Sequence, residues 1–149
     1  MAQAPQGRRE MSDAVPVFVI DSSVAYKWFS SREESRVSEA LELLAGHAAG
    51  ELLLAAPAHM PAEVVNGLRY SRIDAAAVHT AIEGLSEAEI VTVPLDTELL
   101  SSALDLALAY DLTMHDALFP ALAVRLGCEL VTADRAQARV SQCPVRLLA

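Results

Sequence analysis

The sequence predicts an α/β fold, a three-layer α/β/α sandwich in which helices cover both faces of a central parallel sheet. Short apolar runs alternate along the chain with longer segments whose apolar residues recur at helical spacing. The short runs are apolar throughout, which is typical of strands that are buried on both faces. Because helical segments separate the strands, the connections are crossovers, and crossovers produce parallel sheets. We expect four to five strands.

The predicted strands are short and end at polar residues or prolines. VPVFVI at residues 15–20 ends at Asp21, and LLLAA at residues 52–56 is closed by Pro57. Three more strands are EIVTVP, ELVTAD and an edge strand, CPVRLL, at residues 89–94, 129–134 and 143–148.

Helix signals fill the segments between the strands. Ser22 or Ser23 is a suitable N-cap for the segment 22–29, and Pro61 suits the first turn of a helix at residues 61–72. Asp96 is the expected N-cap of a further helix. Helices are also predicted at residues 33–50, 73–88 and 115–127, the last with a kink at Pro120.

Apolar stripes predict the buried faces of two of these helices. The stripe in segment 33–50 consists of Val37, Ala40, Leu41 and Leu44. The stripe after Asp96 consists of Leu100, Ala103, Leu104, Ala107 and Leu108.

Length and composition favour one cytoplasmic domain. A chain of 149 residues that is 53% hydrophobic can bury a core without disulfides or structural metal. Cys128 and Cys143 lack a C-x-x-C partner, so we expect them to be reduced. No apolar run approaches the roughly 20 residues needed to span a bilayer. We interpret the polar residues 1–14 as a disordered tail, with Met11 as an alternative start, and assign residues 15–149 to the domain.

Four acidic residues occupy the positions where a parallel sheet binds its ligands. Asp21 and Asp134 follow the first and fourth strands, while Glu63 and Asp116 lie near helix starts. If these two strands are neighbours, all four carboxylates meet at the carboxyl edge of the sheet. Carboxylates so gathered repel one another unless cations bridge them, and hard oxygen ligands suit Mg²⁺ or Mn²⁺. The chemistry that fits is phosphodiester hydrolysis.

Each of these acids also has an ordinary structural interpretation. Asp21 and Asp116 are possible helix N-caps, and Asp134 is a possible turn residue. Glu63 is a favourable negative charge at a helix start.

The net charge of −9 argues against a protein that coats nucleic acid by charge alone. It leaves room for a local basic patch beside the cleft, and ordinary solvated helix faces explain the same residues equally well. The candidates for such a patch are Lys27, the only lysine, with Arg32, Arg36, Arg69, Arg72 and Arg135. Trp28 is expected in the core and not as a base-stacking platform.

Four segments, VFVIDSSVAYKWF, PAHMPAEVVNGL, HDALFPALAVRLG and LVTADRA, resemble in order the signature segments of PIN-domain ribonucleases of the VapC toxin type. The resemblance implies a PIN-like sandwich and a Mg²⁺-dependent endoribonuclease in which Mn²⁺ substitutes. It also implies an RNA substrate, neutralisation by a VapB-like antitoxin of a type II toxin–antitoxin pair, and a homodimer. The metal-site residues carried over by position are Asp21, Glu63, Asp116 and Asp134, with Asp21 and Asp116 as the most direct ligands.

The resemblance also assigns supporting roles to three polar residues, Thr132, Ser22 and Asn66. The residue before the third acid is often aromatic in this family, whereas here it is His115. His115 is either a phosphate contact, a pH-sensing group or a solvent-exposed residue at a helix start. The remaining histidines are interpreted as surface or packing residues: His47, His59 and His79.

Of three other functions for an α/β protein with an acidic site, two lack the residues that they need. A receiver-type phosphoacceptor domain needs a lysine near the last strand, and the only lysine is Lys27. A haloacid-dehalogenase-type phosphatase needs D-x-D after the first strand, where this chain has Asp21, Ser22 and Ser23. The alternative that stays open is a catalytically weak PIN domain that serves as an RNA- or protein-binding module.

Overall fold

The computed structural model describes residues 14–30 and 35–149, so Met11 and Arg32 lie outside the described residues, as does nearly all of the predicted tail. One parallel sheet has the strand order β3-β2-β1-β4-β5. The strands are β1 (Val17–Ile20), β2 (Leu53–Pro57), β3 (Val91–Val93), β4 (Glu129–Thr132) and β5 (Val145–Leu147). β1 and β4 are neighbours, which is the condition that the predicted acidic site required.

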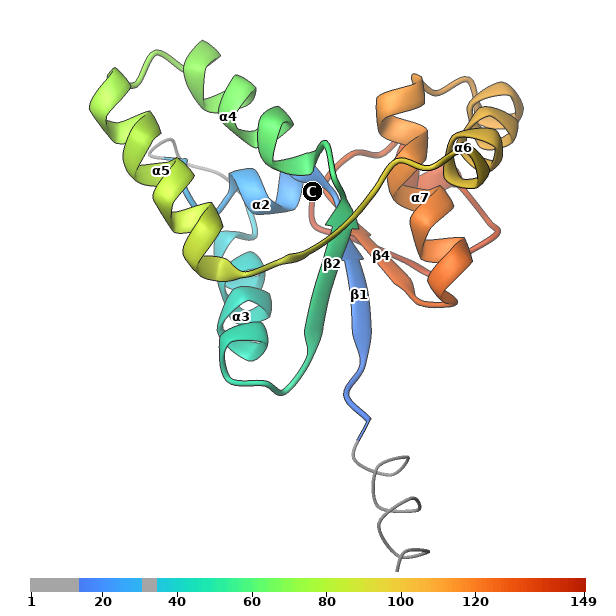
Figure 1. The fold of residues 1–149 in the computed structure, drawn as a ribbon, viewed down its shortest axis with the longest axis horizontal. Helices are drawn as coiled ribbons and strands as arrows, with labels where there is room; N and C mark the ends of the chain where they lie inside the picture. Colours follow the sequence, from blue (N-terminus) through green and yellow to red (C-terminus); the bar gives the residue numbers. More distant parts are fainter. Residues whose placement is uncertain (1–13, 31–34) are drawn as a thin grey trace, which may run out of the picture.

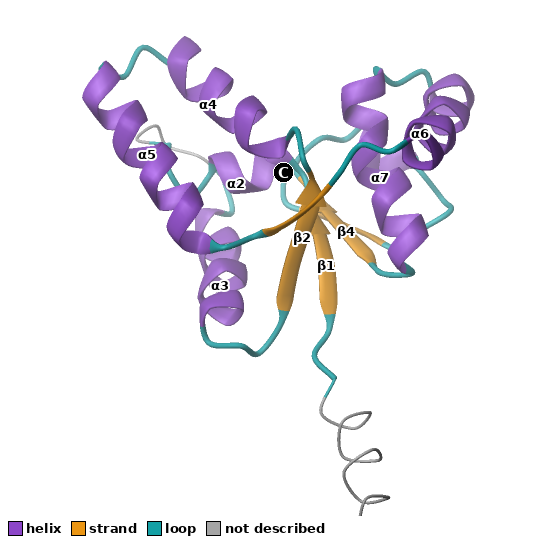
Figure 2. Ribbon diagram, viewed as in Figure 1, coloured by secondary structure: helices purple, strands orange, loops and turns teal. Residues whose placement is uncertain are grey.

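Helices cover both faces of the sheet, as Figures 1 and 2 show. One side carries α2 (Ser22–Tyr26), α3 (Val37–Ala48), α4 (Met60–Tyr70) and α5 (Ala75–Ala88). The other side carries α6 (Thr97–Tyr110) and α7 (Met114–Leu126), of which α7 packs on β1, β2 and β4. A short 3₁₀ helix, η1 (Gln137–Arg139), follows β4. The predicted three-layer sandwich is therefore confirmed.

Burial on both faces holds for the middle of the sheet and fails at both edge strands, β3 and β5. Val19, Leu54 and Leu130 in the three middle strands are fully buried. Val91 in the edge strand β3 is 43% exposed, so the expectation of complete burial is wrong there. An edge strand has a neighbour on one side only, and fewer side chains cover it.

The stripe predictions for α3 and α6 were partly wrong. α6 buries Leu99, Ala103, Leu106 and Ala107, whereas the predicted Leu100, Leu104 and Leu108 are exposed. In α3, Leu43 is buried and Leu41 is exposed. Both helices have apolar residues on more than one face, so spacing alone does not select the face that packs.

The sequence predicted a starting residue for three helices, α2, α4 and α6, and the structure confirms two of the three. Pro61 lies in the first turn of α4, and Asp96 caps α6 by accepting a hydrogen bond from the Leu99 amide. The N-cap of α2 is Asp21 and not Ser22 or Ser23, because Asp21 is the single residue between β1 and the helix. The alternative interpretation of Asp21 as an N-cap is therefore correct as local structure. None of the described helices is both long and apolar enough to cross a membrane.

Candidate metal centre

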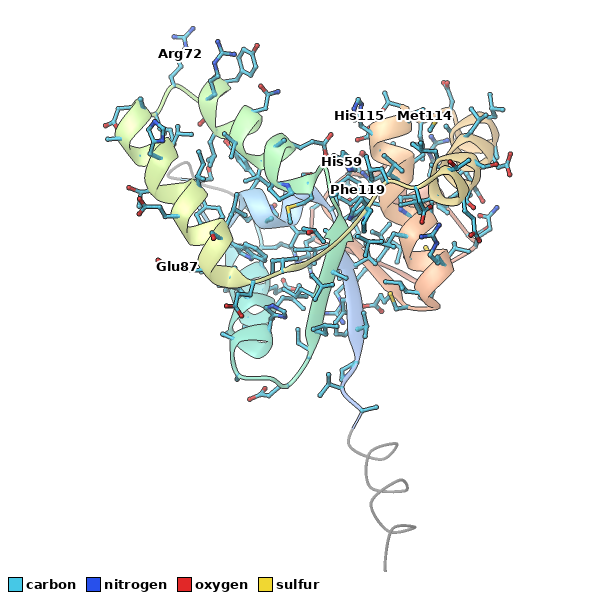
Figure 3. The ribbon with its side chains drawn as sticks, in the orientation of Figure 1. His59, Arg72, Glu87, Met114, His115 and Phe119 are labelled. Atoms are coloured by element: carbon cyan, nitrogen blue, oxygen red, sulfur yellow. The ribbon has the colours of Figure 1, made fainter. Side chains whose placement is uncertain are left out.

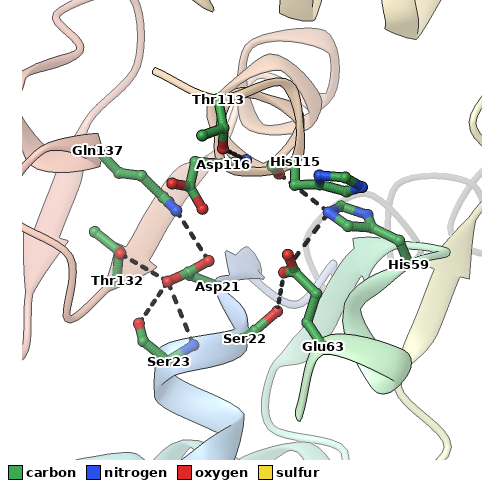
Figure 4. Close-up of polar contacts among 10 residues, drawn as sticks. All are labelled: Asp21, Ser22, Ser23, His59, Glu63, Thr113, His115, Asp116, Thr132 and Gln137. Carbon is green, nitrogen blue, oxygen red and sulfur yellow. Dashed lines mark hydrogen bonds and ion pairs between the residues drawn. The ribbon is translucent and has the colours of Figure 1, made fainter. Parts of the chain in front are cut away.

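Asp21 lies where β1, β4 and α2 meet. Its backbone amide extends the ladder by donating to the carbonyl of Val131 at 2.9 Å, so its side chain is placed at the carboxyl edge of the sheet. The side chain is buried and accepts four hydrogen bonds, all drawn in Figure 4. Oδ2 accepts from the hydroxyls of Ser23 and Thr132 and from the Ser23 amide. Oδ1 accepts from the side-chain amide of Gln137 at 3.0 Å.

Among the described residues, every donor to Asp21 is electrically neutral, so none of these contacts brings a cation to its buried negative charge. Burial raises the pKa of Asp21, and the hydrogen bonds from Ser23, Gln137 and Thr132 oppose that rise. Loss of hydration disfavours the charged form of a carboxyl group, while donors stabilise it. Asp21 is thus a carboxylate whose position is fixed by neutral donors and whose negative charge these contacts leave unpaired.

Asp116 is held at the first turn of α7, which begins beside the same edge of the sheet. Thr113 caps this helix, and its hydroxyl accepts from the Asp116 amide at 3.1 Å. The pKa of Asp116 is raised, first by desolvation and then by the negative charges of Asp134 and Asp21, with a smaller contribution from Glu63. Asp116 is therefore close enough to the other three predicted carboxylates to be repelled by their charges, although they come from separate elements. Its expected alternative role as an N-cap is wrong, because Thr113 is the cap.

Glu63 projects from the first turn of α4 toward the same space (Figure 4). Its Oε1 accepts from the hydroxyl of Ser22 at 2.7 Å, which ties α4 to the start of α2. His59 lies one turn earlier, with Nε2 at 3.7 Å from Glu63 Oε1. The same Nε2 donates to the carbonyl of His115 at 3.0 Å. His59 thereby connects the helix that carries Glu63 with the helix that carries Asp116.

Asp134 follows β4 and combines its place at the site with a turn role. Its Oδ1 accepts from the Ala136 amide at 2.9 Å, so the turn interpretation of this residue is correct as local structure. Its own amide donates to Thr132 Oγ1 at 3.0 Å, and Thr132 donates to Asp21. The buried threonine hydroxyl therefore fixes two of the acids relative to each other.

The residues at this edge fit a hard divalent cation in their chemistry. All four predicted ligands offer carboxylate oxygens, which suit Mg²⁺ and Mn²⁺. Within residues 14–30 and 35–149, no lysine or arginine forms an ion pair with them. In the same ranges, no three His, Cys, Asp or Glu side chains are already close enough together to coordinate a metal ion. A bound cation would thus draw the carboxylates closer together.

The predicted basic patch beside the cleft does not form as expected. Lys27 is 4% exposed, and its ammonium group donates to the carbonyl of Ser35, so the lysine is unavailable to a phosphate. Arg36 is paired with Glu39 and also donates to the carbonyl of Leu147. Arg72 follows the far end of α4, away from the labelled His59 (Figure 3).

The other predicted residues have mixed outcomes. Arg69 lies over the ring of Tyr70, and Arg135 is exposed next to Asp134. Trp28 packs against the core, as expected, and its indole donates to the carbonyl of Ala40. Asn66 is exposed one turn beyond Glu63. Cys128 and Cys143 are free, in agreement with the expectation of reduced thiols.

Sequence reasoning missed three residues whose side chains contact the acids: Ser23, Gln137 and His59. Gln137 is fully buried and donates to Asp21, which precedes it by 116 residues. Its place three residues after Asp134, in a turn at the predicted site, was the available signal. His59 was interpreted as a surface or packing residue. It does pack, on Phe119 at 4.9 Å between ring centroids, and it also contacts the site.

The sheet and its acidic edge define an α/β protein with a carboxylate-rich site at the ends of its two central strands. The chain belongs to the PIN domain family, whose sequence profile matches residues 18–142. PIN domains are nucleases. No curated protein matches the chain.

Solved structures share the fold over most of the chain. A toxin–antitoxin complex from Klebsiella pneumoniae has 20% identity and a TM-score of 0.64, and the match covers 88% of this chain and 97% of that one. VapBC2 from Rickettsia felis, bound to a promoter DNA fragment, has 13% identity and a TM-score of 0.67, covering 89% and 99%. VapC20 from Mycobacterium tuberculosis, a toxin that cleaves the sarcin–ricin loop, has 18% identity and a TM-score of 0.62, covering 85% and 98%.

Proposed function

We propose that this protein is a Mg²⁺-dependent endoribonuclease, with Mn²⁺ able to substitute, that acts in the cytoplasm as the toxin of a toxin–antitoxin pair. The observation that supports the proposal most strongly is the electrostatic state of Asp116. Its pKa is raised first by desolvation and then by three other carboxylates, and no lysine or arginine in the described ranges is paired with any of the four. Neighbouring carboxylates repel one another unless a cation lies between them, so this group of four is expected to bind a cation.

Each residue of the site has a role in this proposal. Asp21 and Asp116 hold the metal most directly, with Asp134 and Glu63 completing the set. The bound ion supplies positive charge that favours attack of water on a phosphodiester. Thr132 and Gln137 orient Asp21 through hydrogen bonds, and Ser22 orients Glu63.

The toxin assignment rests on the structural neighbours. The Klebsiella and Rickettsia structures are toxin–antitoxin assemblies, and VapC20 cleaves an RNA loop. By analogy, we infer a VapB-like antitoxin as the partner, RNA as the substrate and a homodimer as the assembly. The second candidate function is a catalytically weak PIN domain that binds RNA or protein. A nuclease assay with added manganese separates the two, because a pure binding module gives no cleavage.

The proposal is tested by replacing two acids separately, as Asp21→Asn and Asp134→Asn. Each substitution is expected to abolish RNA cleavage, and the double variant should be no worse, because one missing ligand already disables the unit. Asp105→Asn on the exposed face of α6 is the matched control and should cleave like the wild type. Cleavage by either site variant at about one tenth of the wild-type rate or more counts against the assignment.

Asp21→Asn is expected to fold, for a structural reason. The new amide would meet the Gln137 amide donor at the position of Oδ1. Gln137 Oε1 is buried without a hydrogen-bond partner, so rotation of the Gln137 amide presents an acceptor to the new donor. Circular dichroism and thermal melting of the purified variant check this point before activity is measured.

A further inference from the structure

A pocket of about 340 Å³ lies directly beside the four carboxylates. It is lined by His59, Ala62, Glu63, Asn66 and His115, and we call it the histidine pocket. Glu63 belongs both to the pocket and to the acidic site, so a molecule in the pocket is adjacent to whatever occupies that site. Its volume falls within the range of small-molecule sites, roughly 300–1,000 Å³.

The rings of His59 and His115 line the pocket, and together with the ring of Phe119 behind His59 they form a column of three tilted rings. The ring of His115 is 5.6 Å from that of His59, which in turn is 4.9 Å from the ring of Phe119. Phe119 is fully buried, and the side chain of His59 is 11% exposed. His115 is exposed and ends the column at the surface. Figure 3 shows the three residues together at the starts of α4 and α7.

This platform is also rigid. The hydrogen bond from His59 Nε2 to the His115 carbonyl joins the two helices and fixes the orientation of the His59 ring. Within the described residues, His59 Nδ1 is buried without a hydrogen-bond partner, so the bond from Nε2 and the tilted contact with the Phe119 ring hold the His59 ring in place. Flat, preorganised ring surfaces bind flat ligands at low entropic cost.

The polarity of the lining selects the class of ligand. Among the lining residues there is no lysine or arginine, and there is a carboxylate, so the pocket disfavours phosphate. Asn66 offers both a donor and an acceptor, and Glu63 offers acceptors. A flat, neutral group with donors and acceptors on its edge matches these walls, and nucleobases have this chemistry. Single-stranded bases are commonly bound by stacking on aromatic rings with hydrogen bonds to their edges.

We propose that the histidine pocket binds one base of the substrate strand, next to the phosphodiester at the acidic site, and so sets base preference at the cleavage site. This inference rests on the proposed nuclease function. His115 provides the stacking surface, and Asn66 reads the edge of the base. The pocket therefore selects the position at which the strand is cut, while the four acids support the cleavage reaction itself.

The first test uses no cleavage and no metal. The four free nucleosides are neutral and are probed by saturation-transfer NMR, with ribose as the reference ligand. The wild type should transfer saturation to base protons more strongly than to ribose protons. His115→Ala should reduce the base signal several-fold, because stacking on an aromatic ring contributes much of a base's affinity. His79→Ala, an exposed histidine on α5, is the matched control and should leave the signal unchanged. Equal base signals from the wild type and His115→Ala overturn the proposal.

The second test measures cleavage of an RNA pool randomised in sequence, with the product ends sequenced. The wild type should prefer particular bases at one position flanking the cut. His115→Ala should lose that preference and raise KM about tenfold with little change in kcat, whereas His115→Phe should retain it. A fall in kcat with the preference intact would show that His115 acts through Asp116 and would overturn the proposal. Base binding without any cleavage would instead refute the nuclease function and leave the pocket assignment standing.

Discussion

At the scale of single residues, the pKa of Asp116 is the property that responds to the other charges of the acidic site. Its pKa is raised by desolvation and by the charges of Asp134 and Asp21, so the folded protein binds this proton more tightly than the unfolded chain does. A carboxyl group with a raised folded pKa stabilises the fold below its unfolded pKa. That contribution is lost as the pH rises through the raised value. At neutral pH without metal, the charged Asp116 therefore destabilises the folded protein.

Asp116→Asn is expected to raise the melting temperature in EDTA at pH 7. The substitution removes one of the mutually repelling charges at nearly constant shape, and the gain should be about 1 kcal/mol. The difference between the two proteins should shrink as the pH falls toward 4, where the wild-type carboxyl group becomes protonated. Thermal melts across this pH range measure both effects.

Magnesium should reverse this order of stability. The wild type should gain about 1.4 kcal/mol at ten times its dissociation constant, and the variant, which lacks a ligand, should gain less. If Asp116→Asn melts below the wild type in EDTA and both proteins respond equally to magnesium, the four carboxylates do not share a metal site.

At the scale of elements, the start of α7 is the part of the fold on which the site depends most. Thr113 caps the helix by accepting from the Asp116 amide, so one hydrogen bond both begins α7 and sets the position of an acid. His59 holds the same turn from the opposite side through the His115 carbonyl. The N-terminal turn of a helix has amides without partners inside the helix, and a side-chain acceptor there fixes the backbone.

Thr113→Ala is expected to cost about 1 kcal/mol of stability and to lower cleavage by about tenfold. Thr113→Ser retains the hydroxyl and should restore both properties. Asp96→Ala is the matched control, because it removes the cap of α6 at a distance from the acids. Chemical denaturation and cleavage rates should show that both cap losses destabilise, while only Thr113→Ala slows cleavage. An equal loss of activity in Asp96→Ala would show that general destabilisation is the cause.

At the scale of the whole molecule, the charge distribution bears on the choice of partner. The net charge is −9, and no lysine or arginine of the described ranges is paired with the acidic site. A partner that inserts an arginine among the four carboxylates would replace the metal electrostatically, and arginine forms strong paired hydrogen bonds with carboxylates. We infer that the antitoxin neutralises the site in this way.

The complex with the antitoxin should therefore persist when EDTA removes metal. Coexpression of the proposed VapB-like antitoxin should relieve the growth arrest expected of the toxin, and size-exclusion chromatography in EDTA should show the two chains eluting together. Dissociation of the complex on chelation would mean that the metal bridges the chains. The matched sample without EDTA establishes the elution position of the intact complex.

The sequence alone determined the elements and their order, because these depend on local patterns. Continuous apolar runs specified the strands, and Pro61 and Asp96 marked helix starts correctly. The ends of the first and fourth strands located Asp21 and Asp134, since ligands of a parallel sheet bind at the carboxyl ends of its strands. Glu63 and Asp116 joined the predicted site because they lie near helix starts, and the resemblance to VapC-type PIN domains supported the same four positions.

Only the tertiary structure decided which residues meet across long separations. That β1 lies beside β4 depends on packing of the whole sheet, and this neighbourhood brings Thr132 and Gln137 to Asp21. The burial of Lys27 likewise follows from the way the chain packs around it, where its ammonium group donates to the carbonyl of Ser35. His59 became part of the site because α4 and α7 begin side by side, where its ring reaches the His115 carbonyl. Periodicity describes one element at a time, whereas helix rotation and the contacts between elements follow from the packing of all of them together.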